Sequence, residues 1–384
     1  MRTSGMKVVH VSPRVQARGG IEGLHLVHRT LPWPQAFVAM FDRSPERRDD
    51  YTNLNFTWRT TLGQMRRDFA AALSPHAGAA VIYHNAWGLP LFHAGDRAAR
   101  RLAVCHAMPE YHAKDLPACD GLLDGVTGVT PALTAAWPAM LPSLGLGRDS
   151  ILSLPIEPPP GLAARRPGAG ELVLGYAGRV ERVQKRLDRL PEMLRALDAA
   201  GVRYRFEILG DGSLCRELER KLGDRVRFHG WALKEEFWRI MAGWDGIVFL
   251  TECEGGPVAM LEAMALGVIP FYPRIGGSVG DLYAPRVDPK CHYPPGDMAE
   301  LATGIRDVLG RTGAARAALQ DKARALVTAH TPAGYGGQLM ACVDHVIALP
   351  RISSAGKPPR PHWSDLLPLG LVTRAAPQLL RRRG

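Results

Sequence analysis

Two glutamates, Glu254 and Glu262, flank the strongest candidate for a ligand site in the sequence. They lie in the run TECEGGPVAMLEAMALG at positions 251–267, where Pro257 suits the first position of a helix that Gly267 can end. Glu254 then precedes this helix, and Glu262 lies about 7–8 Å along it. The glycines after Glu254 allow a phosphate to approach the helix N-terminus. Two carboxylates beside a phosphate must hold neutral hydroxyl groups, and a nucleotide sugar carries hydroxyls on both sides of its diphosphate.

A basic pair follows an expected strand earlier in the chain. Arg179 and Lys185 come after the apolar run at 172–177 and ahead of the next expected helix. A guanidinium fork and an ammonium group at the end of a strand suit a diphosphate, whose negative charge they would hold. An exposed basic loop explains the same pair, and an acidic loop explains Glu254. Glu262 is harder to explain in that way, because a carboxylate among Ala, Met and Leu needs a partner.

The elements that must position these groups alternate between short apolar runs and helical patterns, which is typical of βαβ units and parallel sheets. Strands are expected at 7–11, 36–41, 80–84, 102–106, 125–130 and 151–154, and again at 172–177, 204–209, 225–229, 246–250 and 268–272. Helices are expected between them, among them 64–73 and one with Asp188 as its N-cap, whereas 42–59 is expected to be irregular. Ligands of such sheets bind at the carboxyl ends of the strands.

Length and charge set the domain organisation. A chain of 384 residues is too long for one hydrophobic core, so two domains are expected. We expect an N-terminal Rossmann-like domain over 1–160, a C-terminal one over 161–349 and a basic tail over 350–384, with the Pro- and Gly-rich residues 155–170 as the linker. The net charge is +11; the tail holds seven Lys and Arg against one Asp, so it contributes +6 and the rest +5.

Cysteine usage and hydropathy exclude several classes of protein. The six cysteines form no C-x-x-C pair and no Cys/His cluster at zinc spacing, and no run of about 18 apolar residues occurs. No signal peptide is expected, because the first expected strand comes almost at once and no apolar signal-peptide core precedes it in this sequence. The sequence therefore favours a reducing cytoplasm, and it predicts neither a metal site nor a membrane span.

Several motifs in order resemble one family of enzymes. The two glutamates are preceded by Gly178-Arg179 with Lys185, by Leu209-Gly210-Asp211-Gly212 and by Val226-Arg227-Phe228-His229-Gly230, and they are followed by Ile275-Gly276-Gly277. In this order the motifs resemble the retaining glycosyltransferases of family 4. The resemblance is strong over the second half of the chain and weak over the first. It implies an α/β protein of the GT-B class, with two Rossmann-like parallel-sheet domains facing a central cleft.

The resemblance also implies a donor site in the C-terminal domain. Arg179 and Lys185 would bind the donor diphosphate. Glu254 would contact the transferred sugar, and Glu262 the ribose. The nucleobase would be bordered by His229, Gly230 and Trp231, although a core position is the favoured interpretation of Trp231. The other expected donor-binding residues lie in the same loops: Gly178, Gly210, Gly255, Gly256 and Val258. Where Gly256 stands the family commonly has a bulky residue, so the identity of the sugar does not carry over.

In the N-terminal domain the resemblance implies a loop and a histidine. Arg18-Gly19-Gly20-Ile21-Glu22 resembles the family's glycine-rich loop after the first strand, which closes on donor and acceptor. His106 ends an expected strand, where the family often has a histidine near the reacting sugar. His84 ends the neighbouring strand and is its rival. A structural role would explain either one, and His106 is favoured.

The expected reaction is transfer of a sugar from a nucleoside-diphosphate sugar, and the resemblance implies retention of its anomeric configuration. Arg179, Lys185 and the helix N-terminus would stabilise the leaving phosphate as charge develops. Glu254 and His106 would act at the reacting sugar. No D-x-D triad follows a strand, so neither a metal nor a cofactor is expected.

Three other functions are weaker interpretations. A sugar-nucleotide 2-epimerase of the same fold remains an alternative. A dinucleotide-dependent oxidoreductase would need G-x-G-x-x-G, which neither glycine loop completes. A nucleic-acid-binding protein is disfavoured because the positive charge is concentrated in the tail.

The tail carries another expected partner. It combines Trp363 and several leucines with seven cations, which suits the interface of an anionic membrane. A disordered extension or a segment packed across both domains would explain it without lipid. The expected partners are a nucleotide sugar, a glycan or lipid-linked acceptor, and an anionic membrane surface, without nucleic acid. The resemblance implies a cytoplasmic enzyme of bacterial surface polysaccharide or glycoconjugate synthesis, bound at the inner face of the membrane if the tail binds lipid.

Overall fold

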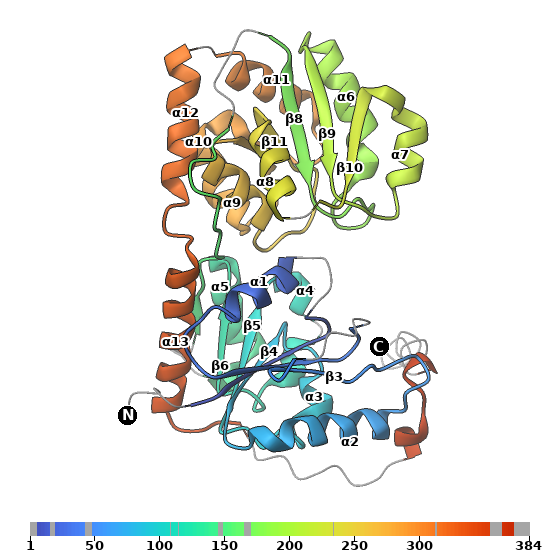
Figure 1. The fold of residues 1–384 in the computed structure, drawn as a ribbon, viewed down its shortest axis with the longest axis vertical. Coiled ribbons are helices and arrows are strands. Elements are labelled where there is room, and N and C mark those ends of the chain that lie inside the picture. Colours follow the sequence, from blue (N-terminus) through green and yellow to red (C-terminus); the bar gives the residue numbers. More distant parts are fainter. Residues whose placement is uncertain are drawn as a thin grey trace. The chain divides into compact units, whose positions relative to one another are not determined.

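The computed structural model describes residues 6–15, 20–42, 48–107, 109–113, 115–144, 149–164, 170–232, 234–311, 313–353 and 363–371. The chain divides into two compact units (Figure 1). The first contains Met1–Gly128, Leu133–Leu152 and Gly336–Gly384, and the second contains Val129–Ala132 and Ser153–Tyr335. Each unit is built on its own parallel sheet, as the alternating pattern predicts.

The first unit has seven strands in the order β3-β2-β1-β4-β5-β6-β7. They are β1 (Val8–Ser12), β2 (Gln35–Ala39), β3 (Tyr51–Asn53), β4 (Ala80–His84), β5 (Arg100–Cys105), β6 (Gly125–Gly128) and β7 (Asp149–Ile151). The prediction that 42–59 is irregular is wrong at β3. This strand pairs with β2. The Tyr51 hydroxyl donates to the Asp42 carboxylate over 2.9 Å, which holds the start of β3 near the residues that follow β2. β7 ends at Ile151, where the prediction placed its start.

Helices follow most of these strands. They are α1 (Gly20–His28), α2 (Leu62–Leu73), α3 (Leu89–Phe92), α4 (Pro109–His112), α5 (Pro131–Met140) and α13 (Pro332–Ala348), with short 3-10 turns η1 (Ser74–His76), η2 (Leu116–Cys119), η3 (Pro142–Leu144) and η7 (Trp363–Leu366). Helix α2 shows why the pattern forms a helix. The Thr61 hydroxyl caps it by accepting from the Gln64 amide, and Met65, Phe69 and Leu73 are buried on one face.

The end of the second domain differs from the predicted boundary at 349. Residues 336–348 of α13 group with the first unit. The Arg100 guanidinium donates to the carbonyls of Ile347 and Leu349, both over 3.1 Å, and Gly125 leaves space for the Val346 side chain. These backbone contacts explain why the last helix belongs to the first sheet.

The tail begins on the first unit as well. The buried Asp124 carboxylate accepts hydrogen bonds from the amides of Ile352 and Ser353 over 2.8 and 2.9 Å. Farther along, the Leu62 amide donates to the Leu367 carbonyl over 3.2 Å, the Leu369 amide donates to the Thr60 carbonyl over 2.9 Å, and Figure 1 shows η7 beside α2. The described parts of the tail are therefore packed on this unit.

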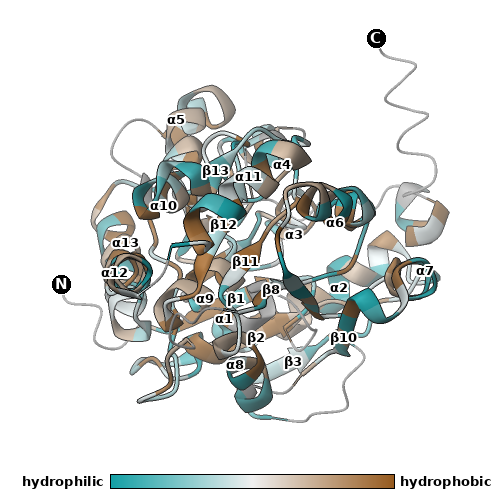
Figure 2. Cartoon of the chain, turned by 90° about the horizontal axis from the view of Figure 1, so that it is seen from above, coloured by the Kyte–Doolittle hydropathy of each residue, from teal (hydrophilic) through white to brown (hydrophobic). Residues whose placement is uncertain are grey.

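The second unit has six strands in the order β10-β9-β8-β11-β12-β13. They are β8 (Leu172–Ala177), β9 (Tyr204–Leu209), β10 (Val226–Gly230), β11 (Gly246–Val248), β12 (Ile269–Pro273) and β13 (His292–Tyr293); the helices are α6 (Leu190–Ala199), α7 (Cys215–Leu222), α8 (Lys234–Ala242), α9 (Val258–Leu266), α10 (Val279–Val287), α11 (Met298–Leu309) and α12 (Gly313–Leu326), with 3-10 turns η4 (Leu187–Arg189), η5 (Gly223–Arg225) and η6 (Pro289–Cys291). Figure 2 shows apolar colouring on β11 and polar colouring on α7, as expected for an inner strand and a surface helix. Among the described strands of this unit, the two-residue β13 is the one that the sequence did not predict.

Two helices of this unit begin differently from the prediction. Asp188 lies inside η4 and does not cap α6, because its carboxylate is bound by the Arg186 guanidinium over 3.1 and 3.2 Å. Pro257 is the residue just before α9 and not its first residue. The predicted end of α9 is confirmed, since Gly267 has a φ of 91° there.

Both sheets share the strand order of a doubly wound fold. In each, the order reverses between the first strand and its neighbour: between β1 and β4 in the first unit, and between β8 and β11 in the second. Ligands of such sheets bind beyond the carboxyl ends of the strands at this switch point. The loops that follow these four strands are therefore the places to look for a site.

Candidate active site

The loops after β8 and β11 are joined by Gln184. Its side-chain amide donates to the Cys253 carbonyl over 2.9 Å. Its own backbone carbonyl accepts from the Glu252 amide over 3.1 Å and from the Thr251 hydroxyl over 2.9 Å. The Arg179 guanidinium donates to the Gln184 side-chain oxygen over 2.7 Å. The fold thus brings the expected basic loop and the expected acidic loop together at the switch point of the second sheet.

The expected cation and carboxylate meet directly. The Lys185 ammonium forms an ion pair with Glu254, and only 14% and 11% of the two side chains are exposed. Arg179 is more exposed and lies 2.7 Å from the Glu181 carboxylate. An incoming phosphate would therefore meet a cation that is already fixed in place. The carboxylate of Glu254 can at the same time accept a hydrogen bond from a neutral hydroxyl.

Glycines let this site form by close backbone approach. Gly210 has a φ of 153°, and a Cβ atom there would lie 1.9 Å from the Gly178 carbonyl oxygen. A Cβ atom on Gly256 would lie 2.0 Å from the Leu154 side chain. Leu154 thus takes the space next to the position where the resembled family has a bulky residue. This accounts for the departure noted in the sequence.

Two helix N-termini lie next to this loop. The Gly255 carbonyl accepts from the Ser278 hydroxyl and from the Val279 amide, both over 3.0 Å. Ser278 caps α10, so the start of α10 is fixed against the residues that lead into α9. Val258 opens α9, and Glu262 is half-buried on it. The positive ends of the two helix dipoles add to the charge of Lys185.

The residues expected near the nucleobase follow β10. The His229 ring nitrogen lies 3.0 Å from the Glu207 carboxylate, which also accepts from the Trp244 indole over 3.1 Å. Gly230 has a φ of 67° at a bulge in the strand. The favoured interpretation of Trp231 as a core residue is wrong, because 46% of this residue is exposed. Trp244, which sequence reasoning did not single out, fills the core space beside Gly175 instead.

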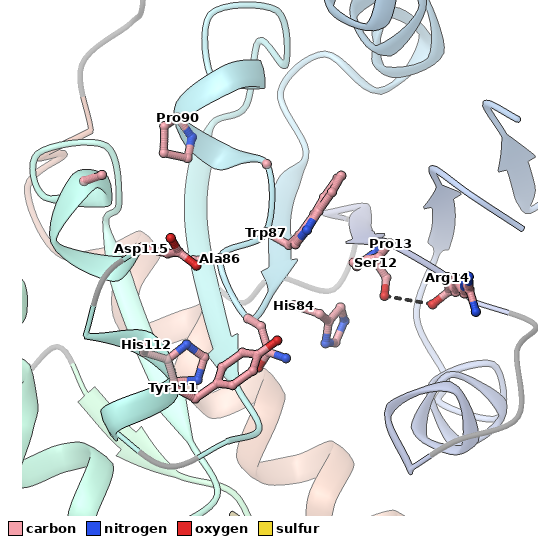
Figure 3. A pocket seen from close by; sticks show the side chains of 13 residues that line it. Ser12, Pro13, Arg14, His84, Ala86, Trp87, Pro90, Tyr111, His112 and Asp115 are labelled. Carbon is pink, nitrogen blue, oxygen red and sulfur yellow. Dashed lines mark hydrogen bonds between the residues drawn. The ribbon is translucent and has the colours of Figure 1, made fainter. Parts of the chain in front are cut away.

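The first unit has a pocket of about 500 Å³ at its own switch point (Figure 3). Its lining comes from the ends of β1 and β4, from the loops that follow them, and from α3, α4 and η2. The lining residues are Ser12, Pro13, Arg14, His84, Asn85, Ala86, Trp87, Gly88, Pro90, Tyr111, His112, Asp115 and Ala118. Asn85 and Ala86 both have a φ of 54°, which is strained for residues with a side chain. Such strain occurs where the surrounding structure imposes it, and ligand sites are common places.

The two rival histidines are hydrogen-bonded to each other. His84 lines the pocket, and its Nδ1 lies 2.9 Å from Nε2 of His106. The His106 amide also donates to the Asn85 side chain over 2.8 Å. Burial lowers the pKa of His106 to about 3, so the imidazole is neutral at pH 7. The preference for His106 stays a prediction. In the glycine-rich loop, Arg18 and Gly19 lie outside the described residues, and Gly20 is the first residue of α1.

Sequence reasoning missed several side chains that lie at these two sites. Arg186 and Arg189 both form ion pairs with Glu252, and the Arg186 backbone has a φ of 53°. In the first unit, Tyr111 and His112 of α4 line the pocket. The basic run at 179–189 is visible in the sequence, but only the fold shows which of its side chains reach residues 252–254.

Comparison with known proteins supports the fold. Residues 171–311 match the family model described as glycosyl transferases group 1. The putative glycosyltransferase EpsF of Bacillus subtilis (strain 168) is 31% identical over 111 residues, a segment that spans 28% of this chain and only 28% of EpsF.

Two solved structures match this chain over nearly their whole length. The lipopolysaccharide outer core galactosyltransferase WaaB, in its apo form, has 16% identity and a TM-score of 0.63 over 88% of this chain and 99% of its own. The pneumococcal O-GlcNAc transferase GtfA, in complex with UDP and GlcNAc, has 11% identity and a TM-score of 0.66 over 90% of this chain and 99% of its own.

The chain has the GT-B fold. The predicted fold class is thereby confirmed. The segment that matches the glycosyltransferase family lies within the second unit, and it contains every residue expected to bind the donor, from Gly178 to Glu262. The pocket between β1 and β4 lies outside that segment.

Proposed function

We propose that this protein is a retaining glycosyltransferase that uses a nucleoside-diphosphate sugar and needs no metal for the transfer. The observation that carries the proposal is the Lys185–Glu254 ion pair, held by adjoining loops at the switch point of the sheet that matches the glycosyltransferase family. The donor diphosphate binds at Lys185, Arg179 and the starts of α9 and α10. Glu254 accepts from a hydroxyl of the transferred sugar, and Glu262 from the ribose.

The proposed transfer needs no covalent intermediate. The bond between the anomeric carbon and the leaving phosphate breaks as an oxocarbenium-like charge develops, and Lys185 and Arg179 stabilise the departing phosphate. The acceptor hydroxyl attacks the anomeric carbon from the face that the phosphate leaves, and it gives its proton to that phosphate. Attack from this face retains the anomeric configuration. The acceptor, a glycan, lipid-linked or small hydroxylated molecule, binds in the pocket of the first unit. Since WaaB is a lipopolysaccharide galactosyltransferase, we place the reaction in bacterial surface polysaccharide or glycoconjugate synthesis.

Donor binding and turnover should respond differently to the two glutamates. We expect UDP-, GDP- or ADP-sugars to raise the melting temperature of the wild type, because a ligand that binds only the folded state stabilises it. Glu262→Ala should lose most of this shift. Glu254→Gln should keep it but lower kcat, because contacts to the reacting sugar strengthen in the transition state. Thermal-shift and steady-state assays measure both effects.

Glu236→Ala, on an exposed position of α8, is the matched control and should behave as wild type. If Glu262→Ala leaves both the donor KM and kcat unchanged, the ribose assignment is wrong. Incubation with a nucleotide sugar alone tests the epimerase alternative. A sugar epimer formed without an acceptor would replace the transferase proposal.

We also propose that the tail side of the first unit binds anionic membranes. None of the described helices is both long and apolar enough to cross a bilayer. Trp363, Leu366 and Leu371 of the tail are exposed, and Trp58 is exposed where its carbonyl accepts from the Gly370 amide over 2.9 Å. Large apolar side chains beside a tail with seven cations suit a lipid interface.

The double variant Trp58→Ala, Trp363→Ala should reduce sedimentation with vesicles of phosphatidylglycerol and phosphatidylcholine at low salt. The expected loss in partitioning is at least about tenfold, since burying one such side chain contributes about 1.5–3 kcal/mol. Ile151→Ala, another exposed apolar position, is the control. Point variants are needed because truncation after Leu349 would remove Ser353 from Asp124. Equal pelleting of the double variant and the wild type, or pelleting unchanged by high salt, would exclude this surface.

A further inference from the structure

Four histidines of the first unit form a buried cluster, and one of them, His84, also lines the pocket proposed to bind the acceptor. His10 lies on β1, His84 ends β4, and His25 and His28 lie three residues apart on α1. At most 1% of each residue is exposed. One ring nitrogen from each lies within 4.8 Å of the others. Side chains buried this completely are usually apolar, so a group of four imidazoles requires an explanation.

The fold explains how residues far apart in the sequence meet. β1 and β4 are parallel neighbours, with His10 opposite Ile82, so His84 lies on the same face of the sheet as His10. On α1, positions three apart face the same direction. The helix presents His25 and His28 to the two strand histidines.

We propose that these four histidines bind one Zn²⁺ ion as a structural site. Zinc is held by ring nitrogens at 2.0–2.1 Å, so the nitrogens at two corners of its tetrahedron are about 3.3–3.4 Å apart. Nδ1 of His10 lies 3.1 Å from Nε2 of His84, and Nδ1 of His25 lies 3.3 Å from Nδ1 of His28. Two of the nitrogen–nitrogen distances in the cluster are therefore already close to those in a tetrahedral zinc site.

Gln35 selects the tautomer of His10 in which Nδ1 is free to bind a metal. Its side-chain nitrogen donates to the backbone carbonyl of His28 and, over 3.5 Å, to that of Leu31. The Gln35 side-chain oxygen is therefore the atom 3.1 Å from Nε2 of His10. Nε2 must carry the proton, which leaves the lone pair of Nδ1 directed at the other histidines. Ligating histidines commonly donate their second N–H to such an oxygen.

The remaining chemistry agrees with this assignment. Burial lowers the pKa of His10 to about 4 and lowers the pKa of the other three well below the ordinary value. The imidazoles are therefore neutral at pH 7, the form that binds metals. Nε2 of His25 is buried without a hydrogen-bond partner among the described residues. The described cluster contains no carboxylate, which favours an ion that imidazoles hold over Mg²⁺ or Ca²⁺, which require oxygens.

The test uses the full chain and no nucleotide sugar, so its result is independent of the proposed transferase activity. The protein is incubated with excess Zn²⁺, passed through a desalting column and analysed for bound metal and for its melting temperature. We expect one retained Zn²⁺ per chain and a higher melting temperature. Co²⁺ in place of Zn²⁺ should give the visible absorption of a tetrahedral nitrogen site. A wild type that retains no Zn²⁺ and shows no shift would overturn the proposal.

Variants locate the ion. His25→Gln combined with His28→Gln should abolish retention, whereas His76→Gln, a histidine on η1 outside the cluster, should not change it. Retention in the double variant equal to that of the wild type would place the ion elsewhere and overturn the assignment. Because the double variant can fail to fold, Gln35→Leu provides a second measurement. Loss of this outer partner should weaken Zn²⁺ binding about 10–100-fold, and unchanged affinity would contradict the site.

Discussion

Lys185→Ala is expected to lower kcat by about 10²-fold or more. Removing one preformed group that stabilises a developing negative charge has this order of effect. Lys185 already lies at the junction of the two loops, paired with Glu254, so no rearrangement is needed to bring its charge to the leaving phosphate. Arg179→Ala should have a similar effect. Steady-state kinetics with the donor identified by thermal shift provide the measurement.

The control for this loss is Arg182→Ala, in the same loop. Arg182 is exposed and pairs with Glu217 over 3.2 Å, away from Glu254, so its removal should leave kcat near the wild-type value. The melting temperatures of all variants are compared, because Lys185→Ala leaves the Glu254 carboxylate without its cation. Normal turnover in Lys185→Ala, or a strict requirement for added Mg²⁺ or Mn²⁺ in the wild type, contradicts the proposed charge stabilisation.

Asp96→Asn is expected to cost about 3–5 kcal/mol of stability, the range measured when one partner of a buried ion pair is removed. Asp96 and Arg101 are both fully buried. The Arg101 guanidinium donates to both Asp96 oxygens over 2.7 and 2.9 Å, and the Tyr83 hydroxyl donates to the same carboxylate over 2.7 Å. The variant would remove the negative charge of the carboxylate to which the buried guanidinium donates both hydrogen bonds. The melting temperature of the first unit should fall by roughly 6–20 °C.

An exposed ion pair serves as comparison. Arg274 and Glu300 lie 3.3 Å apart with 47% and 49% of their side chains exposed, so Glu300→Ala should cost less than about 1 kcal/mol. Scanning calorimetry can follow the two units as separate transitions. Asp96 lies in the first unit and Glu300 in the second. If Asp96→Asn lowers the first-unit transition as little as Glu300→Ala lowers the second-unit transition, the buried pair does not have the stabilising role assigned to it.

Much of the fold was predictable from the sequence because buried parallel strands are short apolar runs bounded by turn residues. β4, β8 and β9 have their predicted bounds. β3 was not predictable in this way, since Tyr51 to Asn53 contains little apolar sequence and its pairing is accompanied by the long-range hydrogen bond between Tyr51 and Asp42. The unit boundary at 336 was missed because it depends on the hydrogen bonds of Arg100 to α13.

The candidate donor site was predictable to the extent that its residues lie in order along the chain. Glu254, Glu262 and Lys185 follow expected strands, and the structure places Lys185 against Glu254. The histidine cluster shows where such reasoning ends. His25 and His28 have a visible spacing, but the sequence analysis found no zinc pattern. Only the pairing of β1 with β4 adds His10 and His84 to them.

The packing of residues 336–353 on the first unit has a consequence for synthesis on the ribosome. The first unit is discontinuous in sequence: its β1 to β7 emerge early, but the backbone that Arg100 and Asp124 bind emerges only after the whole second unit. Residues 153–335 can therefore complete their own sheet first, while the earlier half lacks the carbonyls that Arg100 binds and the amides that the buried Asp124 carboxylate accepts from. Because a domain with incomplete packing is prone to aggregation, the N-terminal half is the part that chaperones would have to protect during translation.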